Sequence, residues 1–244
     1  MVAGMTISVR LAQACVDRGG QRVVHEVDLN VERGSWFGLI GANGSGKTSL
    51  LRALAGRLPF ANGACWVDGE PLGHDRKGRA LRFGFSPPAD MLPNALRGRD
   101  VLELASGAKD DVRSRLGSLD LALGLTPLLD RWIGDCSAGM RQRIAIAAAF
   151  VGGHTHVILD EPFNWLDPVA VFDLRQVLRE RVADGLTLVT ALHDLGTLAT
   201  ACDAGLMLAD GKVALTLDTV TLKAAAQNPQ EFERQTINSL RSQV

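Results

Sequence analysis

The sequence predicts an α/β fold: a parallel sheet covered by helices, with an antiparallel β subdomain at one edge and an inserted α-helical subdomain. Three observations predict it. Apolar runs of strand length at 36–40, 157–159 and 186–192 are each followed by helical patterning. Two Asp-Gly pairs beside apolar runs indicate antiparallel hairpins, and a long central stretch lacks strand signals. Alternation of strands and helices favours a parallel sheet with helices on its faces.

The N-terminal part of the chain, residues 5–33, has the pattern of β structure. Val27 and Leu29 alternate with polar residues, which is typical of a strand with one wet face. The Asp-Gly pairs at 68–69 and 210–211 lie beside apolar runs. Asp-Gly is a preferred sequence for tight hairpin turns, so we expect an antiparallel hairpin at each pair.

The helical subdomain is expected at about 88–150, where apolar patches such as Val101-Leu102 have helical spacing and strand signals are missing. The length of 244 residues allows one large domain with such an insertion. We expect a single domain over residues 5–234. A polar C-terminal tail, residues 235–244, follows it.

The composition is that of an ordinary globular chain and excludes two classes of function. A net charge of −1 provides no basic surplus, so we expect no nucleic-acid partner. The longest apolar run, 144–151, has eight residues, whereas a helix needs about 20 to cross a bilayer. The four cysteines show no metal-ligand spacing and are expected to be reduced thiols. We therefore expect a soluble protein whose role at a membrane, if it has one, passes through another subunit.

The strongest motif is a phosphate-binding loop between a buried strand and a helix. It reads Gly41-Ala42-Asn43-Gly44-Ser45-Gly46-Lys47-Thr48 and fits the pattern G-x-x-x-x-G-K-[ST]. The glycines let successive N–H groups point at phosphates, and the following helix adds the positive end of its dipole. Lys47 should reach the β- and γ-phosphates and Thr48 should bind Mg²⁺, while Ser49 completes the nucleotide-binding segment. The motif predicts a P-loop NTPase.

A second motif supplies carboxylates for a metal ion and for catalysis. The apolar strand 156–159 ends in Asp160-Glu161, as a Walker B strand does. Asp160 would bind Mg²⁺, and Glu161 would polarise the attacking water. An apolar strand can end in acids by chance, but its pairing with a phosphate loop makes chance a poor explanation.

With a third motif the chain resembles the ATP-binding cassette (ABC) family over about residues 6–230. The run Cys136-Ser137-Ala138-Gly139-Met140 is similar to the family signature Leu-Ser-Gly-Gly-Gln. It departs from the signature at three positions and keeps the serine and second glycine, which face phosphate. The signature opens a helix, so Ser137 and the N–H of Gly139 should lie at its positive end.

Two further segments extend the resemblance. The segment 164–167 resembles the D-loop, which implies that Asp167 lies at a contact between two subunits. His193 ends a strand and resembles the switch histidine, which implies contact with the γ-phosphate together with Glu161. Two usual family residues are missing. Pro88 stands where the family has a Gln near Mg²⁺, and Arg18 stands where an aromatic residue stacks on adenine.

The resemblance implies a nucleotide-binding subunit with the cofactors ATP and Mg²⁺. Two chains would pack head to tail around two ATP molecules, so Ser137 and Gly139 of one chain would cap ATP held by Lys47 of the other. The partners would be an integral-membrane transporter subunit and a second copy or a homologous cassette. The location would be cytoplasmic, peripheral on the inner face of the membrane. The run after the signature serine resembles bacterial exporters, so the leading hypothesis is an ATPase that powers export.

Two alternatives stay open at this point. One is a soluble ABC ATPase of the assembly or repair type, although the chain has neither a second cassette nor a long coiled coil. The other is a cassette that binds ATP and hydrolyses it poorly, which Pro88 and Arg18 favour.

Overall fold

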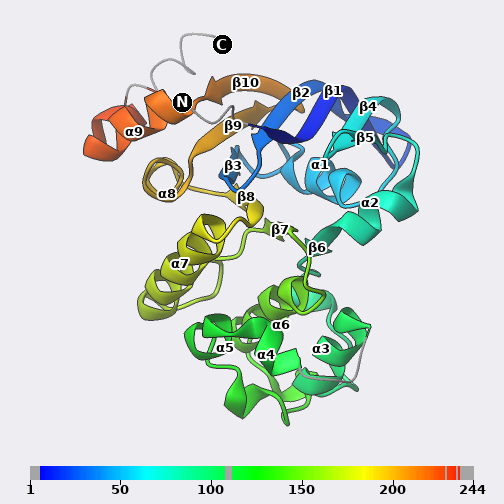
Figure 1. Cartoon of the computed structure of the whole chain (residues 1–244), viewed down its shortest axis with the longest axis vertical. Coiled ribbons are helices and arrows are strands. Elements are labelled where there is room, and N and C mark those ends of the chain that lie inside the picture. The colour runs from blue at the N-terminus through cyan, green and yellow to red at the C-terminus, as the bar shows by residue number, and fades with distance from the viewer. Residues whose placement is uncertain (1–5, 108–111, 229, 235, 237–244) are drawn as a thin grey trace.

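The computed structural model describes residues 6–107, 112–228, 230–234 and 236 (Figure 1). The polar tail predicted at 235–244 therefore lies outside the described residues, except for Thr236. Within the described part, no helix is long and apolar enough to span a membrane.

An antiparallel sheet forms one side of the molecule, with the strand order β2-β1-β4-β5. Its strands are β1 (Ile7–Arg18), β2 (Gln21–Glu32), β4 (Asn62–Val67) and β5 (Glu70–Pro71). Asp68 and Gly69 join β4 to β5 with positive φ angles of 50° and 82°, the backbone of a tight hairpin turn. The sheet confirms the predicted antiparallel edge subdomain.

The central sheet has six strands in the order β10-β9-β3-β8-β7-β6. They are β3 (Trp36–Ile40), β6 (Phe83–Phe85), β7 (His156–Asp160), β8 (Thr187–Leu192), β9 (Ala204–Ala209) and β10 (Lys212–Leu217). Neighbouring strands from β9 to β6 are parallel, and β9 and β10 form the hairpin predicted at Asp210-Gly211. The carboxyl ends of parallel strands lie at one edge of a sheet, so the segments after β3, β7 and β8 come together there.

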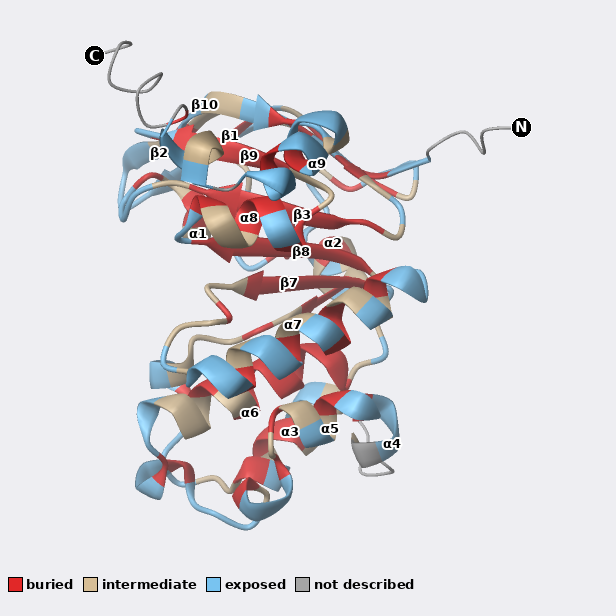
Figure 2. Cartoon of the chain, turned by 90° about the vertical axis from the view of Figure 1, so that its left-hand side faces the viewer, coloured by how far each residue is buried: buried red, intermediate tan, exposed pale blue. Residues whose placement is uncertain are grey.

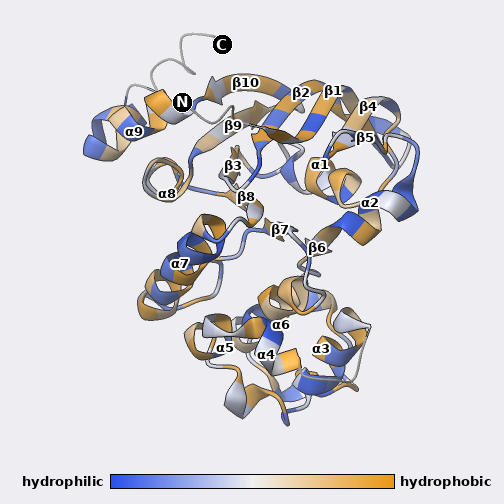
Figure 3. Cartoon of the chain, viewed as in Figure 1, coloured by the Kyte–Doolittle hydropathy of each residue, from blue (hydrophilic) through white to orange (hydrophobic). Residues whose placement is uncertain are grey.

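Two apolar cores hold these layers together. Leu50, Leu51 and Leu54 of α1 (Lys47–Leu54) pack between the two sheets, against residues of β1, β2, β3 and β8. The second core joins the other face of the central sheet to most of the remaining helices. α7 (Pro168–Ala183) and α8 (Leu195–Ala201) contribute to this core, and α9 (Thr219–Gln227) packs against α8. Figure 2 shows the central strands as buried, and Figure 3 shows that the outer helices mix hydrophilic and hydrophobic residues.

Helices and short 3₁₀ turns fill the stretch predicted as a helical subdomain. The helices are α3 (Gly98–Ser106), α4 (Val112–Leu116), α5 (Ser118–Ala122) and α6 (Ala138–Phe150), with 3₁₀ turns at Ala89–Met91, Thr126–Leu128 and Ile133–Asp135. They lie together at one end of the molecule (Figure 1). α2 (Arg76–Arg82) precedes β6. The proposed boundaries of the domain and subdomain remain predictions.

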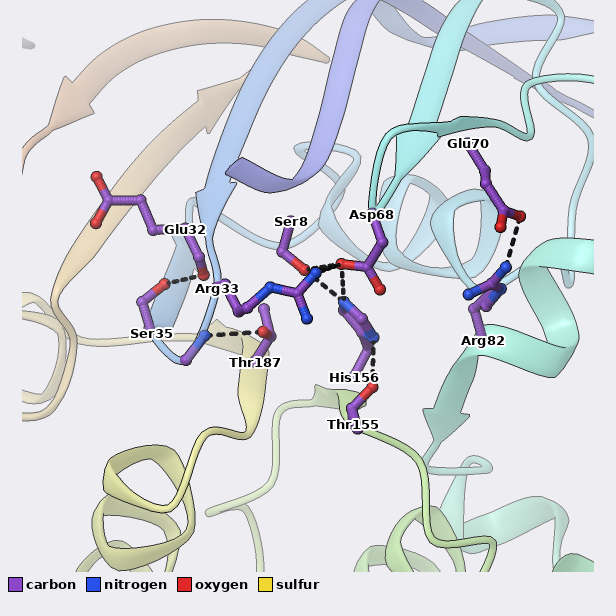
Figure 4. A network of polar contacts seen from close by, with 11 residues as sticks. Ser8, Glu32, Arg33, Ser35, Asp68, Glu70, Arg82, Thr155, His156 and Thr187 are labelled. Carbon is purple, nitrogen blue, oxygen red and sulfur yellow. Dashed lines mark hydrogen bonds and ion pairs between the residues drawn. The ribbon is translucent and has the colours of Figure 1, made fainter. Parts of the chain in front are cut away.

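A polar network around His156 connects the two sheets (Figure 4). The Oγ of Ser8, on β1, donates to Asp68 Oδ1 at 2.7 Å and lies 2.6 Å from His156 Nε2. Because the hydroxyl proton of Ser8 goes to Asp68, Nε2 carries the hydrogen and donates to Ser8. Arg33 donates to the same carboxylate at 2.6 Å, and Thr155 Oγ1 lies 3.1 Å from Nδ1. His156 is buried, and this burial lowers its pKa.

Candidate functional site

The phosphate loop lies where predicted, between β3 and the first residue of α1. Gly46 has a φ of 100°, and a Cβ atom there would lie 2.7 Å from the carbonyl oxygen of Val23, so only glycine fits. The ammonium of Lys47 is buried against its own loop and donates to the carbonyls of Gly41 and Ala42 at 2.7 and 3.1 Å. Burial lowers the pKa of Lys47, opposed by the charges of Glu161 and Asp160 at the end of β7. The loop thus holds its cation beside its own backbone.

A cavity of about 350 Å³ opens on this loop and defines where a phosphate chain could lie. Its walls include the loop and the start of α1 together with Glu161. The lining residues are Arg18, Val23, Asn43, Gly44, Ser45, Gly46, Lys47, Thr48, Ser49 and Glu161. Arg18, at the position where the family has an aromatic residue, therefore lies in the wall of the same cavity.

The carboxylate pair ends β7, two strands away from β3 in the sheet. Burial raises the pKa of Asp160, and the neighbouring Thr48 side chain opposes this shift. The Oδ1 atom of Asp160 is buried and has no hydrogen-bond partner in the described structure. An unpaired buried oxygen costs free energy unless a donor or cation satisfies it. The pair Thr48–Asp160 therefore provides oxygen atoms suited to a hard cation.

Glu161 follows Asp160 and meets a histidine from the next strand. The Nε2 atom of His193, directly after β8, lies 2.8 Å from Glu161 Oε2. Asn164 Nδ2 donates to the same oxygen at 2.9 Å and lies 3.4 Å from His193 Nε2. The structure thus brings together a carboxylate, an imidazole and an amide at the edge where parallel strands end.

A second cavity, of about 370 Å³, lies on the carboxylate side of this site. Its walls include Thr48, Asp160 and Glu161, and also Pro88 and Asn164. Pro88 directly precedes the 3₁₀ turn Ala89–Met91, and it lines the space beside the carboxylates. A proline side chain has no donor or acceptor to place there.

The signature segment forms the start of α6 and lies outside both cavities. Ser137 caps the helix, and its Oγ accepts from the N–H of Met140 at 3.3 Å. A Cβ atom on Gly139 would lie 2.5 Å from the carbonyl oxygen of Trp165, so this position requires glycine. Neither Ser137 nor Gly139 lines either cavity. Within one chain, the structure keeps these two predicted nucleotide contacts apart from the phosphate loop.

Asp167 has partners within its own chain. It caps α7, accepting from the N–H groups of Val169 and Ala170 at 3.1 and 3.0 Å, and pairs with Arg143 at 2.9 Å. The capping hydrogen bond to Ala170 is the main cause that lowers the pKa of Asp167. Its predicted place at a contact between subunits remains a prediction.

The motif analysis missed one residue that holds the site, Gln142. This buried side chain of α6 donates to the carbonyl oxygens of Glu161 and Pro162, each at 3.2 Å. Its position five residues after the signature serine was visible in the sequence, but nothing in the pattern pointed to the Glu161 backbone.

A family model described as "ABC transporter" matches residues 24–164. A putative ABC transporter ATP-binding protein of Halobacterium salinarum is 34% identical over 216 residues, which are 86% of this chain and 93% of that protein. The aliphatic sulfonates import ATP-binding protein of Mesorhizobium japonicum is 31% identical, covering 88% of this chain and 81% of its own. The Nod factor export ATP-binding protein I of Cupriavidus pinatubonensis is 30% identical, covering 86% and 68%.

Solved structures give the same grouping. An ATP-binding subunit of an ABC transporter superposes with a TM-score of 0.79 at 27% identity, over 93% of this chain and 98% of that one. A dimeric ATP-binding cassette bound to ADP and Pi, in a post-hydrolysis state, has a TM-score of 0.76 at 22% identity, over 86% and 98%. The second likeness shows a shared fold only.

Proposed function

This chain belongs to the ABC transporter family of ATP-binding subunits, and we propose that it hydrolyses ATP with the residues named above to power a membrane transporter. The observation that carries the proposal is the meeting of Lys47, Thr48, Asp160 and Glu161 around two cavities at one sheet edge. These side chains come from segments that follow two different strands, so the fold itself brings them together.

In this proposal the phosphate chain of ATP lies along the loop Gly41–Gly46. Backbone N–H groups of the loop and of the first turn of α1, which includes Ser49, would bind it. Lys47 would turn from the carbonyls of its loop to the phosphates. An ammonium with only carbonyl partners gains a stronger partner in a phosphate oxygen.

Thr48 and Asp160 would hold Mg²⁺, and the buried Oδ1 of Asp160 without a partner supports this assignment. A magnesium ion usually keeps several waters and takes one or two protein ligands, which fits this sparse donor set. When bound, the ion would neutralise charge on the phosphate oxygens.

Glu161 and His193 would carry the hydrolytic step. Glu161 would accept a hydrogen bond from the attacking water and orient it towards the γ-phosphate. His193 would place its ring N–H against the γ-phosphate, where negative charge has to be stabilised. Both residues follow buried strands, so their backbone positions are well fixed.

A second copy, or a homologous cassette, would complete each site. Ser137 and Gly139 lie at the positive end of α6, outside the cavities of their own chain, as expected for residues that meet the nucleotide of a partner. The dimeric ADP-bound cassette of the same fold is consistent with this arrangement. Asp167 would lie near the contact between the two chains.

The membrane partner would dock in a groove of about 840 Å³ between the sheet region and α3. Leu81, Met91 and Leu104 line it and are each more than 70% exposed, so nothing among the described residues covers this apolar surface. We assign it to a cytoplasmic segment of the integral-membrane subunit. The groove shares wall residues with the carboxylate-side cavity, which would connect the partner to the nucleotide. The protein would then be peripheral on the cytoplasmic face of the membrane.

For the direction of transport we propose export, because the run 139–143 resembles bacterial exporter cassettes. The relatives include one named for import and one named for export, so the direction needs its own assay. Substrate uptake into inside-out vesicles on addition of MgATP would support export. ATP-driven substrate uptake by right-side-out vesicles loaded with MgATP would contradict it.

A cassette that binds ATP and hydrolyses it poorly is the second candidate, since Pro88 lines the cavity of the carboxylates. Phosphate release from MgATP by the purified chain separates the two candidates. Turnover that Glu161→Gln removes supports the ATPase. Saturable ATP binding without turnover, also in the presence of the membrane subunit, supports the second.

The docking groove is tested by site-specific cross-linking in membranes. The four native cysteines are buried, so a new surface cysteine would be the reactive thiol. Met91→Cys and Leu104→Cys should cross-link to the integral-membrane subunit of the purified transporter. Val220→Cys, equally exposed on α9, serves as the matched control. Equal cross-linking from all three positions would contradict the assignment.

A further inference from the structure

The amide of Asn164, the first residue of the D-loop-like segment 164–167, contacts the proposed catalytic carboxylate. Its Nδ2 donates to Glu161 Oε2 at 2.9 Å. His193 Nε2 approaches the same oxygen, at 2.8 Å. An amide oxygen in the place of Nδ2 would face carboxylate lone pairs, so the donor orientation is the favourable one. Asn164 therefore occupies one acceptor site of Oε2 with a donor that cannot titrate.

The backbone keeps Asn164 at this distance. Its N–H donates to the carbonyl of Glu161 at 3.3 Å, which closes a tight turn. Glu161 and Trp165 both have positive φ, 54° and 64°, values that non-glycine residues rarely adopt. Gln142, on α6, donates to the carbonyls of Glu161 and Pro162. The turn is thus held in a sparsely populated conformation that aims the amide at the carboxylate.

We propose that Asn164 is a positioning residue for ATP hydrolysis: it holds the carboxylate of Glu161 in the orientation that the attacking water requires. The proposal rests on the proposed function of Glu161. For Nε2 of His193 to reach a phosphate, it must leave Oε2 of Glu161. The hydrogen bond from Asn164 Nδ2 to Oε2 would then remain. Oε1 of Glu161 would then be free to accept a hydrogen bond from the water, while Asn164 keeps the carboxylate from rotating.

The first test replaces Asn164 by Ala, which removes the donor. We expect kcat for MgATP hydrolysis to fall about tenfold, the scale of one hydrogen bond to a charged group. The KM for ATP and the melting temperature should change little, because the phosphate contacts lie elsewhere. Asn30→Ala, at an exposed asparagine of β2, is the matched control and should retain the parent rate. A parallel loss of ATP affinity and thermal stability would indicate a merely structural role and overturn the proposal.

Two conservative variants sharpen the result. Asn164→Ser keeps a short donor and should restore part of the rate lost in Asn164→Ala. Asn164→Asp keeps the shape, removes the donor and places a second carboxylate opposite Glu161, so it should be the slowest. An Asn164→Asp variant as fast as the parent would overturn the proposal.

A double-mutant cycle separates this inference from the proposed function. In single-turnover assays, Asn164→Ala should slow the parent but add less than twofold to Glu161→Gln, because the group that it positions is then gone. If Glu161→Gln alone keeps the parent rate, the proposed function fails. If Glu161→Gln abolishes turnover while Asn164→Ala stays within twofold of the parent, only the role of Asn164 fails. Full additivity in the cycle would also overturn that role.

Discussion

The Nε2 atom of His193 lies 2.8 Å from Oε2 of Glu161, although the two residues follow different strands of the central sheet. Because β7 and β8 are parallel neighbours, their carboxyl ends lie together and the two side chains meet there. In the proposed mechanism, this contact places an acceptor for a water proton beside a donor for a phosphate oxygen.

Glu161→Gln should retain ATP binding, lose most turnover and accumulate as an ATP-bound dimer. Glutamine keeps the size of the side chain but cannot polarise the water, while the residues proposed to hold ATP between two chains are untouched. Size-exclusion chromatography with MgATP should show a dimer, and without nucleotide a monomer. A variant that stays monomeric at high protein concentration with MgATP would argue against the head-to-tail arrangement.

Lys47→Ala should abolish tight ATP binding without unfolding the protein. Lys47 is the full positive charge that the loop provides, and it is buried among carbonyl oxygens of the same loop. Equilibrium binding of a fluorescent ATP analogue gives the affinity, and circular dichroism checks the fold. Affinity within a few-fold of the parent would count against the phosphate-loop assignment.

Pro88→Gln should lower the Mg²⁺ requirement and increase the ATPase rate. Pro88 lines the cavity shared by Thr48, Asp160 and Glu161, where a glutamine could supply an oxygen that proline lacks. One such contact is worth about 1–3 kcal/mol, so the rate could rise by up to about a hundredfold if all of it acts in the transition state. Titrating Mg²⁺ against both proteins measures the effect. Overlapping curves would mean that Pro88 serves only as a turn.

His156→Gln should flatten the dependence of stability on pH. Burial lowers the pKa of His156 in the folded chain, so below about pH 6.5 the unfolded chain binds a proton that the folded chain does not. Above about pH 6.5, His156 is neutral in both states and its proton affinity costs no stability. As the pH falls from about 6.5 towards the lowered pKa of the folded chain, the unfolded chain takes up the proton and the free energy of unfolding decreases. Urea unfolding between pH 5 and 8 should show a steeper acid loss for the parent than for the variant. His74→Gln, at an exposed histidine, is the control; equal slopes for all three proteins would contradict the prediction.

The sequence was sufficient for most of the strands, because buried strands appear as apolar runs and the Asp-Gly pairs at 68–69 and 210–211 mark hairpins. A third pair, Asp184-Gly185, instead ends α7, and the short strand β6 was not predicted. The phosphate loop was also visible, since its chemistry requires glycines at fixed spacing. Side-chain contacts between different elements could not be predicted from the sequence. The contact of Ser8 with His156 joins residues of different sheets, and the bond from Gln142 to the Glu161 carbonyl depends on how α6 packs below β7. Such partners depend on the three-dimensional packing, which a periodic pattern does not specify.

Asp167 shows a similar limit. Its position after the carboxylates suggested a contact between subunits, whereas capping α7 and pairing with Arg143 are local tasks that any Asp at a helix start can perform. Both roles are compatible, since Asp167 is exposed at about half of its side chain.

The docking groove and the carboxylate-side cavity share four wall residues: Arg52, Phe85, Pro87 and Pro88. A shared wall means that whatever shifts these residues from one side changes the shape of the other side. Thermodynamic linkage then makes the effect reciprocal. The factor by which a docked segment tightens or loosens nucleotide binding must equal the factor by which nucleotide tightens or loosens the docked segment. A measurement of either affinity, with and without the other ligand, therefore fixes the coupling free energy for both.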